Sequence, residues 1–135
     1  DLADAIAQCV VVDADVKVSK QRLNDLLVVG TDTDVGKTVI SALLMRAAAR
    51  YGHGVTYLKP IQTGKDSDTK AVQQLAEVND SSMSAPLVEL RLPASVDQAA
   101  AAEGVHITIN DVLPKVRQVI ADNELTVIET AGGLL

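Results

Sequence analysis

The chain has 135 residues, a length typical of one domain with a buried core, and its formal net charge of −6 excludes general nucleic-acid binding, which needs a basic surface. With 1% aromatic residues, its core must be built from aliphatic side chains, and stacking on bases is excluded. One cysteine excludes an internal disulfide, and no apolar run approaches the ~20 residues that span a bilayer, so we expect a soluble cytoplasmic protein.

Residues 1–25 form a first segment to which no chemistry can be assigned. We expect an N-terminal extension of unknown role, followed by one domain over residues 26–135. The first residue is Asp rather than Met, and the last residues stop just after a predicted strand and turn. The sequence therefore reads as part of a longer polypeptide, incomplete at the C-terminus.

The regular pattern begins with a predicted strand over 26–29, then Gly-Thr-Asp-Thr-Asp-Val-Gly-Lys-Thr at Gly30–Thr38, then an alanine-rich helix over 37–50. A loop at a helix N-terminus directs unpaired N–H groups and the positive end of the helix dipole at one point, which suits a polyphosphate. Lys37 can place a mobile charge between the outer phosphates, and the Thr38 hydroxyl can ligate magnesium. The sequence therefore predicts nucleotide binding.

The opening of this loop departs from the usual phosphate-loop pattern. Counting back from Gly36, the first glycine is expected at Thr31, but Gly30 stands one residue earlier. The alternative is an ordinary turn with a solvated Lys37. The order of strand, loop and helix favours phosphate binding.

Further strands and helices alternate after this unit. Gly52 and Gly54 end the first helix, and a polar loop follows Lys59 and Pro60. Strands are predicted over 55–58, 87–92 and 125–129, and helices over 69–78, 96–103 and 110–122, the last capped by Asn110. This alternation predicts an α/β fold with a mostly parallel sheet and flanking helices, a Rossmann-like three-layer arrangement of the P-loop NTPase type.

Ligands of such sheets gather at the carboxyl ends of the strands, here Gly30–Thr38, Lys59–Gly64 and Glu129–Gly133. We expect the amine of Lys59 to point into the same crevice as Lys37. A solvated lysine is the alternative, but Gln62, Thr63 and Gly64 add polar groups beside a second cation.

Three acids are candidate metal ligands. Asp66 and Asp68 precede a predicted helix, where capping is the default role. Glu129 ends a buried apolar strand, where an ionised carboxylate is costly unless a metal or cation pairs with it. The alternative for Glu129 is a salt bridge to a structural Lys or Arg.

Other residues are assigned no chemistry. His53 and His106 lie in polar segments with no acid or nucleophile nearby in sequence, and we expect both at the surface. Met45 falls on the apolar face of the helix over 37–50, so we expect it in the core. Met83 falls in a polar turn, where exposure is expected.

Three separated motifs together resemble the dethiobiotin synthase family. They are Gly-Thr-Asp-Thr-Asp-Val-Gly-Lys-Thr at Gly30–Thr38, Leu-Lys-Pro-Ile-Gln-Thr-Gly at Leu58–Gly64 and Ile-Glu-Thr-Ala-Gly-Gly at Ile128–Gly133. The match runs over 26–135 and covers the N-terminal part of that family's fold. The resemblance implies ATP- and magnesium-dependent carboxylation of 7,8-diaminononanoate with CO2, then closure of a cyclic urea, in biotin biosynthesis.

The resemblance also implies roles for individual residues. Lys37 and Lys59 are the implied catalytic residues. Nucleotide and Mg²⁺ binding is implied for Asp34, Val35, Gly36, Lys37, Thr38, Asp68 and Glu129, of which Thr38, Asp68 and Glu129 ligate the metal. Contact with the diamine and its carbamate is implied for Thr33, Lys59, Thr63 and Gly132. A homodimer without membrane or nucleic-acid partners is implied for the full-length protein.

The motifs also depart from the family, and two other functions stay open. Thr130 stands where the family often has glycine, and Leu92–Asp97 lacks a frequent Pro-His pair. A phosphate-loop amidotransferase domain of the cobyrinate type shares the loop and the second lysine, but its aspartate after Gly-Pro is missing. A partitioning or cell-division switch ATPase of the ParA/MinD kind places a signature lysine where this chain has Asp32.

Overall fold

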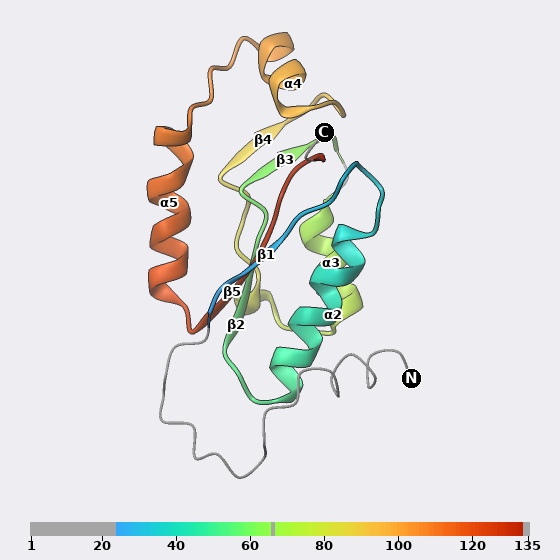
Figure 1. The fold of residues 1–135 in the computed structure, drawn as a ribbon, viewed down its shortest axis with the longest axis vertical. Coiled ribbons are helices and arrows are strands. Elements are labelled where there is room, and N and C mark those ends of the chain that lie inside the picture. The colour runs from blue at the N-terminus through green and yellow to red at the C-terminus, as the bar shows by residue number, and fades with distance from the viewer. Residues whose placement is uncertain (1–23, 66, 134–135) are drawn as a thin grey trace.

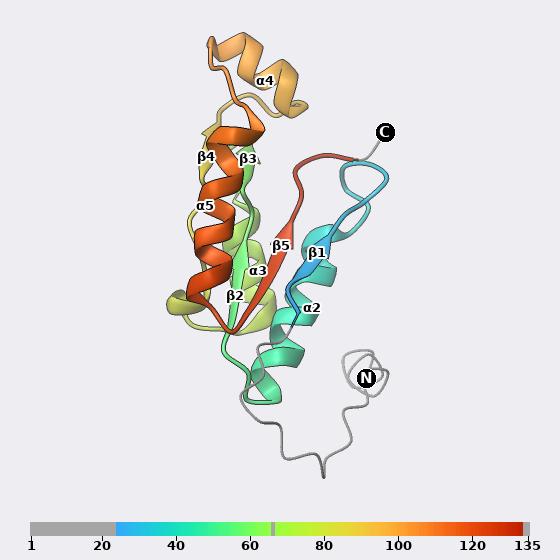
Figure 2. The same ribbon diagram turned by 60° about the vertical axis from the view of Figure 1, so that its left-hand side comes forward.

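The computed structural model describes residues 24–65 and 67–133 of the chain. Figure 1 shows a central sheet with helices along both of its sides, and Figure 2 shows the same layers after rotation. The sheet strands are β1 (Leu26–Val28), β2 (Val55–Leu58) and β5 (Leu125–Glu129), and the helices are α2 (Lys37–Arg50), α3 (Asp68–Ala76) and α5 (Ile109–Asp122). The predicted P-loop NTPase-like α/β fold is confirmed.

The three strands of this sheet are parallel and run in the order β1-β5-β2. Leu27 pairs with Ile128 on one side of β5, and Tyr57 pairs with Val127 on the other. The strand that comes last in the sequence is therefore the central one. All four residues of β2 are buried, as expected for a strand covered on both faces.

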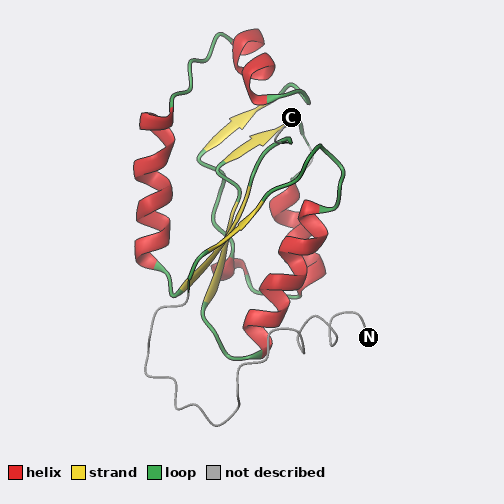
Figure 3. Ribbon diagram, viewed as in Figure 1, coloured by secondary structure: helices red, strands yellow, loops and turns green. Residues whose placement is uncertain are grey.

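A second, two-stranded parallel sheet lies beside α4 (Val96–Glu103), as Figure 3 shows. Its strands are β3 (Ile61–Thr63) and β4 (Val88–Leu90). The sequence predicts a loop over residues 61–63, and this prediction is wrong. These three residues form a strand because they pair with residues 88–90, which are distant in the sequence. Leu90 and Ala99 form a small core of their own between β4 and α4.

The helix ends also correct the sequence analysis. The cap of α5 is Thr108 rather than Asn110, and Thr108 with Asp111 forms a capping box. Helix α3 is capped by Ser67, whose hydroxyl accepts from the Lys70 N–H at 3.3 Å. The short 3-10 helix η1 (Asp80–Ser82) between α3 and β4 was absent from the predicted elements.

The main core lies between the sheet and α2, with Met45 fully buried as predicted. Met83 packs against this core and is half-buried, so the predicted exposure is wrong; its segment runs along the edge of β2, where Met83 pairs with Tyr57. His53 is also half-buried, with Nδ1 3.2 Å from Glu124 Oε1, a partner too distant in sequence to be foreseen.

Among the described residues, no helix has the length and apolar character needed to cross a membrane. The predicted N-terminal extension over residues 1–25, including Cys9, lies almost wholly outside the described ranges. Its role stays a prediction.

Candidate functional site

The loop between β1 and α2 has the backbone of a phosphate-binding turn. Asp34 and Gly36 have positive φ angles of 54° and 96°, and α2 starts directly after Gly36. The Gly36 carbonyl accepts the Ile40 N–H at 3.0 Å, which closes the first turn of the helix. The N–H groups of this first turn have no intrahelical partners, so they are available to an anion.

Gly30 has a steric role in this loop. A Cβ at Gly30 would lie 2.6 Å from Val35 Cγ2 and 3.1 Å from Cδ of Lys37, closer than side chains pack. Gly30 therefore leaves room for the stem of Lys37 to cross the loop. The Lys37 ammonium donates to the Asp32 carbonyl at 2.6 Å. A glycine one residue before the usual position thus still serves the placement of Lys37.

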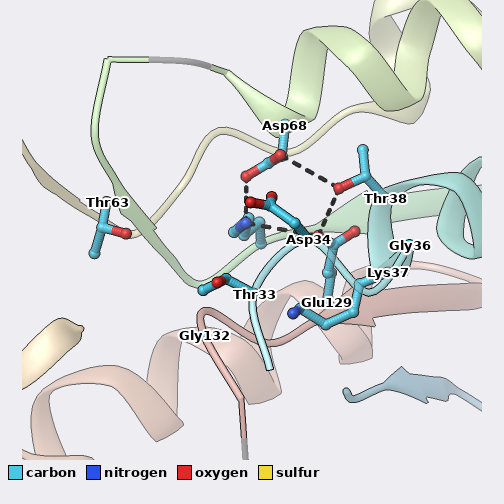
Figure 4. Close-up of a pocket in the computed structure, with 10 residues that line it drawn as sticks. Thr33, Asp34, Gly36, Lys37, Thr38, Thr63, Asp68, Glu129 and Gly132 are labelled. Atoms are coloured by element: carbon cyan, nitrogen blue, oxygen red, sulfur yellow. Dashed lines mark hydrogen bonds and ion pairs between the residues drawn. The ribbon is translucent and has the colours of Figure 1, made fainter. Parts of the chain in front are cut away.

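A cavity of about 340 Å³ opens beside this loop. Figure 4 shows that its walls come from the loop, α2, β3, the start of α3 and the segment after β5. Its lining residues are Thr33, Asp34, Gly36, Lys37, Thr38, Lys59, Thr63, Asp68, Glu129 and Gly132. These are the predicted site residues with the exception of Val35, which is 51% exposed and lies beside Gly30.

Glu129 is the most buried ionisable group of the cavity, with 1% of its surface exposed. Its Oε2 atom accepts from Ser41 Oγ at 2.7 Å and from Tyr57 OH at 3.1 Å. Its Oε1 atom lies 3.2 Å from Thr38 Oγ1 and 3.6 Å from Lys59 Nζ. The two oxygens therefore have different surroundings. Oε2 accepts from two buried hydroxyls that do not line the cavity, whereas Oε1 faces Thr38 and Lys59, which do.

Lys59 lies between the carboxylates of Asp68 and Glu129 and is 7% exposed. Its ammonium forms an ion pair with Asp68 as well as the longer pair with Glu129. Asp68 Oδ1 lies 3.3 Å from Thr38 Oγ1, whose single proton can go to either carboxylate. Asp68 therefore contacts residues of the cavity, and the cap of α3 is Ser67 instead. Asp66 lies outside the described residues.

Tyr57 remains a hydrogen-bond donor under ordinary conditions. Burial raises the pKa of its phenol, and the charge of Glu129, the hydrogen bond to Glu129 and the charge of Asp68 raise it further. The neutral phenol therefore keeps its proton on the side of Oε2.

The donor set of the cavity fits a hard divalent cation. Two carboxylates, from Asp68 and Glu129, converge with the Thr38 hydroxyl, as Figure 4 shows. Within the described residues no three His, Cys, Asp or Glu side chains gather as a complete metal cage. One or two carboxylates plus phosphate oxygens and water are the set that Mg²⁺ prefers. The carboxylates lining the cavity, with Asp34 included, also outnumber Lys37 and Lys59, so a polyphosphate needs a further cation.

Two residues that contact Glu129 are missing from the predicted site, Ser41 and Tyr57. Both carry a spacing signal. Ser41 follows Thr38 by three residues on α2. Tyr57 on β2 precedes Lys59, the residue directly after that strand, by two residues. Each therefore has the spacing that places it on the same side as a predicted site residue. That signal has meaning only once α2 and β2 are known to face Glu129.

Residues 24–135 match the family described as AAA domain. The chain is similar to proteins named ATP-dependent dethiobiotin synthetase BioD, 42% identical over 114 residues in Rhodococcus erythropolis and 38% over 113 residues in Mycobacteroides abscessus. A protein of the same name from Methanocaldococcus jannaschii is 28% identical over 113 residues.

These matches cover 81% to 82% of this chain and 48% to 53% of each relative, so the chain spans about half the length of the curated relatives it matches. The resemblance to dethiobiotin synthases carried by the three motifs is confirmed by these relatives. The chain belongs to the AAA domain family of P-loop proteins.

Proposed function

We propose that this chain carries the ATP- and metal-binding half of a dethiobiotin synthetase, which carboxylates 7,8-diaminononanoate with CO2 and closes the cyclic urea of dethiobiotin. One observation carries the proposal: Lys37, Thr38, Lys59, Asp68 and Glu129 line one cavity at the carboxyl ends of the strands. The names of the relatives support ATP dependence and dethiobiotin as the product, and the resemblance of the three motifs implies the substrates.

The proposed reaction has three steps: carbamate formation, phosphoryl transfer and ring closure. One amine of the substrate adds CO2 to give a carbamate, and a carbamate oxygen then attacks the γ-phosphorus of ATP. ADP leaves, and a carbamic-phosphoric anhydride results. The second amine attacks the carbonyl carbon, the C–O bond to phosphate breaks, and inorganic phosphate leaves as the ring closes. No protein nucleophile is needed.

The described residues suit the electrostatic demands of these steps. A carbamate that approaches a triphosphate brings two anions together, so catalysis requires positive charge held in place. Lys37 lies at the phosphate loop and Lys59 lies toward β3, where Thr63 also faces the cavity. We assign Lys37 to the phosphates and Lys59 to the carbamate, with Thr33, Thr63 and Gly132 beside the diamine.

We assign Mg²⁺ to Thr38, Asp68 and Glu129. When bound there it would offset the charge of the phosphates. The Lys59 ammonium pairs with both of these carboxylates, so with Mg²⁺ as their partner Lys59 would be available to the substrate. Asp34, Val35 and Gly36 contribute the turned backbone beside the phosphates. We further propose residues 26–135 as one domain and a homodimer as the assembly.

The test is incorporation of label from ¹⁴C-bicarbonate into dethiobiotin by the purified full-length protein that contains this chain. We expect label in the product only when ATP, Mg²⁺ and 7,8-diaminononanoate are all present. Phosphate release that does not depend on the diamine would defeat the assignment and favour a switch ATPase.

A further inference from the structure

We infer that Tyr57 and Ser41 are positioning residues that fix the Glu129 carboxylate so that only its Oε1 atom serves the cavity cation. The inference rests on the proposed function, since it concerns the metal site assigned there. Neither residue touches the cavity: both approach Glu129 from the side away from it and do not line it.

The positions follow from the elements that carry them. Ser41 stands one helical turn after Thr38 on α2, so both hydroxyls reach the same carboxylate from one helix face. Tyr57 pairs with Val127 across β2 and β5, and Glu129 lies two residues beyond Val127 on the same face of the sheet. The phenol thus reaches the carboxylate diagonally across the strands.

The hydrogen-bond capacity of Glu129 explains why these contacts orient it. A carboxylate oxygen has two lone-pair directions, and Oε2 uses both, with Ser41 at 2.7 Å and Tyr57 at 3.1 Å. Oε1 keeps its remaining capacity toward Thr38 and Lys59. A free carboxylate could rotate and bind through either oxygen, whereas this one is held with one oxygen forward. Ligating carboxylates held by outer hydrogen bonds bind metals more tightly than unsupported ones.

Ser41 and Tyr57 are also fully buried, which makes the arrangement rigid. Their hydroxyls have no water to exchange with, and Tyr57 lies in the main core beside Met45. A buried carboxylate without its donors would have an unsatisfied oxygen, so the side chain would turn to find another partner. The expected partner is Lys59, and that rotation would close the cation site.

The test measures Mn²⁺ binding in the presence of a non-hydrolysable ATP analogue, with free Mn²⁺ followed by electron paramagnetic resonance. The variants are Tyr57→Phe, Ser41→Ala and both together. We expect each single change to weaken Mn²⁺ affinity about tenfold and the double change up to about 100-fold. Nucleotide affinity measured in EDTA should stay unchanged in all three, which a merely structural defect would not allow.

Thr126→Val is the matched control. Thr126 lies on β5, three residues before Glu129, is fully buried, and its Oγ1 finds no hydrogen-bond partner within the described chain. Removal of that hydroxyl should leave Mn²⁺ affinity unchanged. Glu129→Gln is the reference and should abolish binding. If the double variant does not fold, the two single variants carry the test.

Two outcomes separate the inference from the proposed function. If the double variant binds Mn²⁺ as tightly as wild type while Glu129→Gln loses Mn²⁺ binding, the positioning role is overturned and the metal site remains supported. Unchanged affinity in Glu129→Gln overturns the metal site and the positioning role with it. Equal losses of Mn²⁺ affinity and of nucleotide affinity in EDTA would also overturn the inference, because the defect would then be general.

Discussion

Lys37 and Lys59 both line the cavity, but their partners differ. The Lys37 ammonium is held by the Asp32 carbonyl of its own loop, whereas Lys59 is held by two carboxylates. A carbonyl is a weaker partner for an ammonium than a carboxylate. The two lysines are therefore equipped for different ligands, although their residue type is the same.

Replacement of each lysine should separate these roles. We expect Lys37→Ala to abolish ATP turnover, and Lys59→Ala to leave nucleotide binding in place while lowering diamine-dependent turnover about 100-fold or more. Steady-state kinetics with ATP and diamine varied in turn measure this split. Equal residual activity and equal nucleotide affinity in both variants would contradict it.

Gly133 has a steric role that can be tested with one methyl group. A Cβ at Gly133 would lie 2.4 Å from the Thr31 carbonyl oxygen and 2.7 Å from Asp32 Cα, both backbone atoms. Gly133→Ala should therefore displace the phosphate loop, lower the free energy of unfolding by about 1–3 kcal/mol, and weaken nucleotide binding.

The control for that change is Gly104→Ala. Gly104 has φ +65° but no atom within 4 Å of a new Cβ. We expect a stability loss of about 1–2 kcal/mol from the left-handed backbone alone, with nucleotide affinity unchanged. Denaturant titration and nucleotide binding of both variants check the pair, and a normal nucleotide affinity in Gly133→Ala would refute the contact.

For single residues, the sequence predicts those that line the cavity, but it does not predict the residues that hydrogen-bond to them from outside it. The phosphate-loop motif identifies Lys37 and Thr38 from the sequence alone. A charged residue at the end of a buried apolar strand identifies Glu129. Ser41 and Tyr57 are not identified in this way, since each is an ordinary residue of an amphipathic helix or a buried strand. Only the approach of α2 and β2 to β5 gives them a common partner.

Among the elements, helix α5 shows how a local hydrogen-bond pattern decides a boundary. Thr108 N–H donates to Asp111 Oδ2 at 2.9 Å, and the Thr108 hydroxyl donates to the same atom at 2.6 Å. Asn110 was a reasonable cap from its residue type, but Thr108 and Asp111 have the spacing of a capping box and satisfy the helix end together.

This capping box predicts a pH-dependent contribution to stability. The hydrogen bonds from Thr108 lower the pKa of the Asp111 carboxyl, so its contribution is fully present above the ordinary value of 3.8 and is lost as pH falls through the lowered pKa. Asp111→Asn should remove that acid dependence, and Thr108→Ala should cost about 1 kcal/mol near pH 7. Thr108→Ser is the control that keeps the hydroxyl.

Urea unfolding at pH 7 and at pH 3 measures these effects. Identical acid sensitivity in wild type and Asp111→Asn would show that the carboxylate does not stabilise α5.

The elements with strong periodicity could be predicted, and those made by distant pairing could not. Strands β2 and β5 and helix α2 fall within a residue of their expected bounds, because apolar runs and glycine stops mark them. Strand β3 was expected to be loop, because Ile61–Thr63 is short and polar in part and becomes a strand by pairing with Val88–Leu90.

For the whole molecule, ligand binding should be visible as stability. A ligand that binds only the folded state at 100 times its dissociation constant adds about 2.7 kcal/mol, which raises the melting temperature by several degrees for a domain of this size. We expect such a rise with a non-hydrolysable ATP analogue and Mg²⁺, and a smaller one when EDTA removes the metal. Differential scanning fluorimetry measures both.

Lys37→Ala should show neither increase, since its ammonium is assigned to the phosphates. A melting temperature that rises equally with and without EDTA would argue against the assigned metal ligands Thr38, Asp68 and Glu129. The fold class at this scale followed from the order of strands and helices, whereas the separate β3-β4 sheet needed long-range contacts to be seen.

The strand order also has a consequence for synthesis. Since β5 lies between β1 and β2, these two strands cannot be joined in one sheet until residues 125–129 have left the ribosome. Until then β1 and β2 lack their shared partner, and Glu129 reaches Thr38 and Lys59 only once β5 has been made. The contacts of Glu129 with Thr38 and Lys59 thus form in the same step that joins β1 and β2 through β5. A polypeptide halted before residue 125 would have neither these contacts nor the three-stranded sheet.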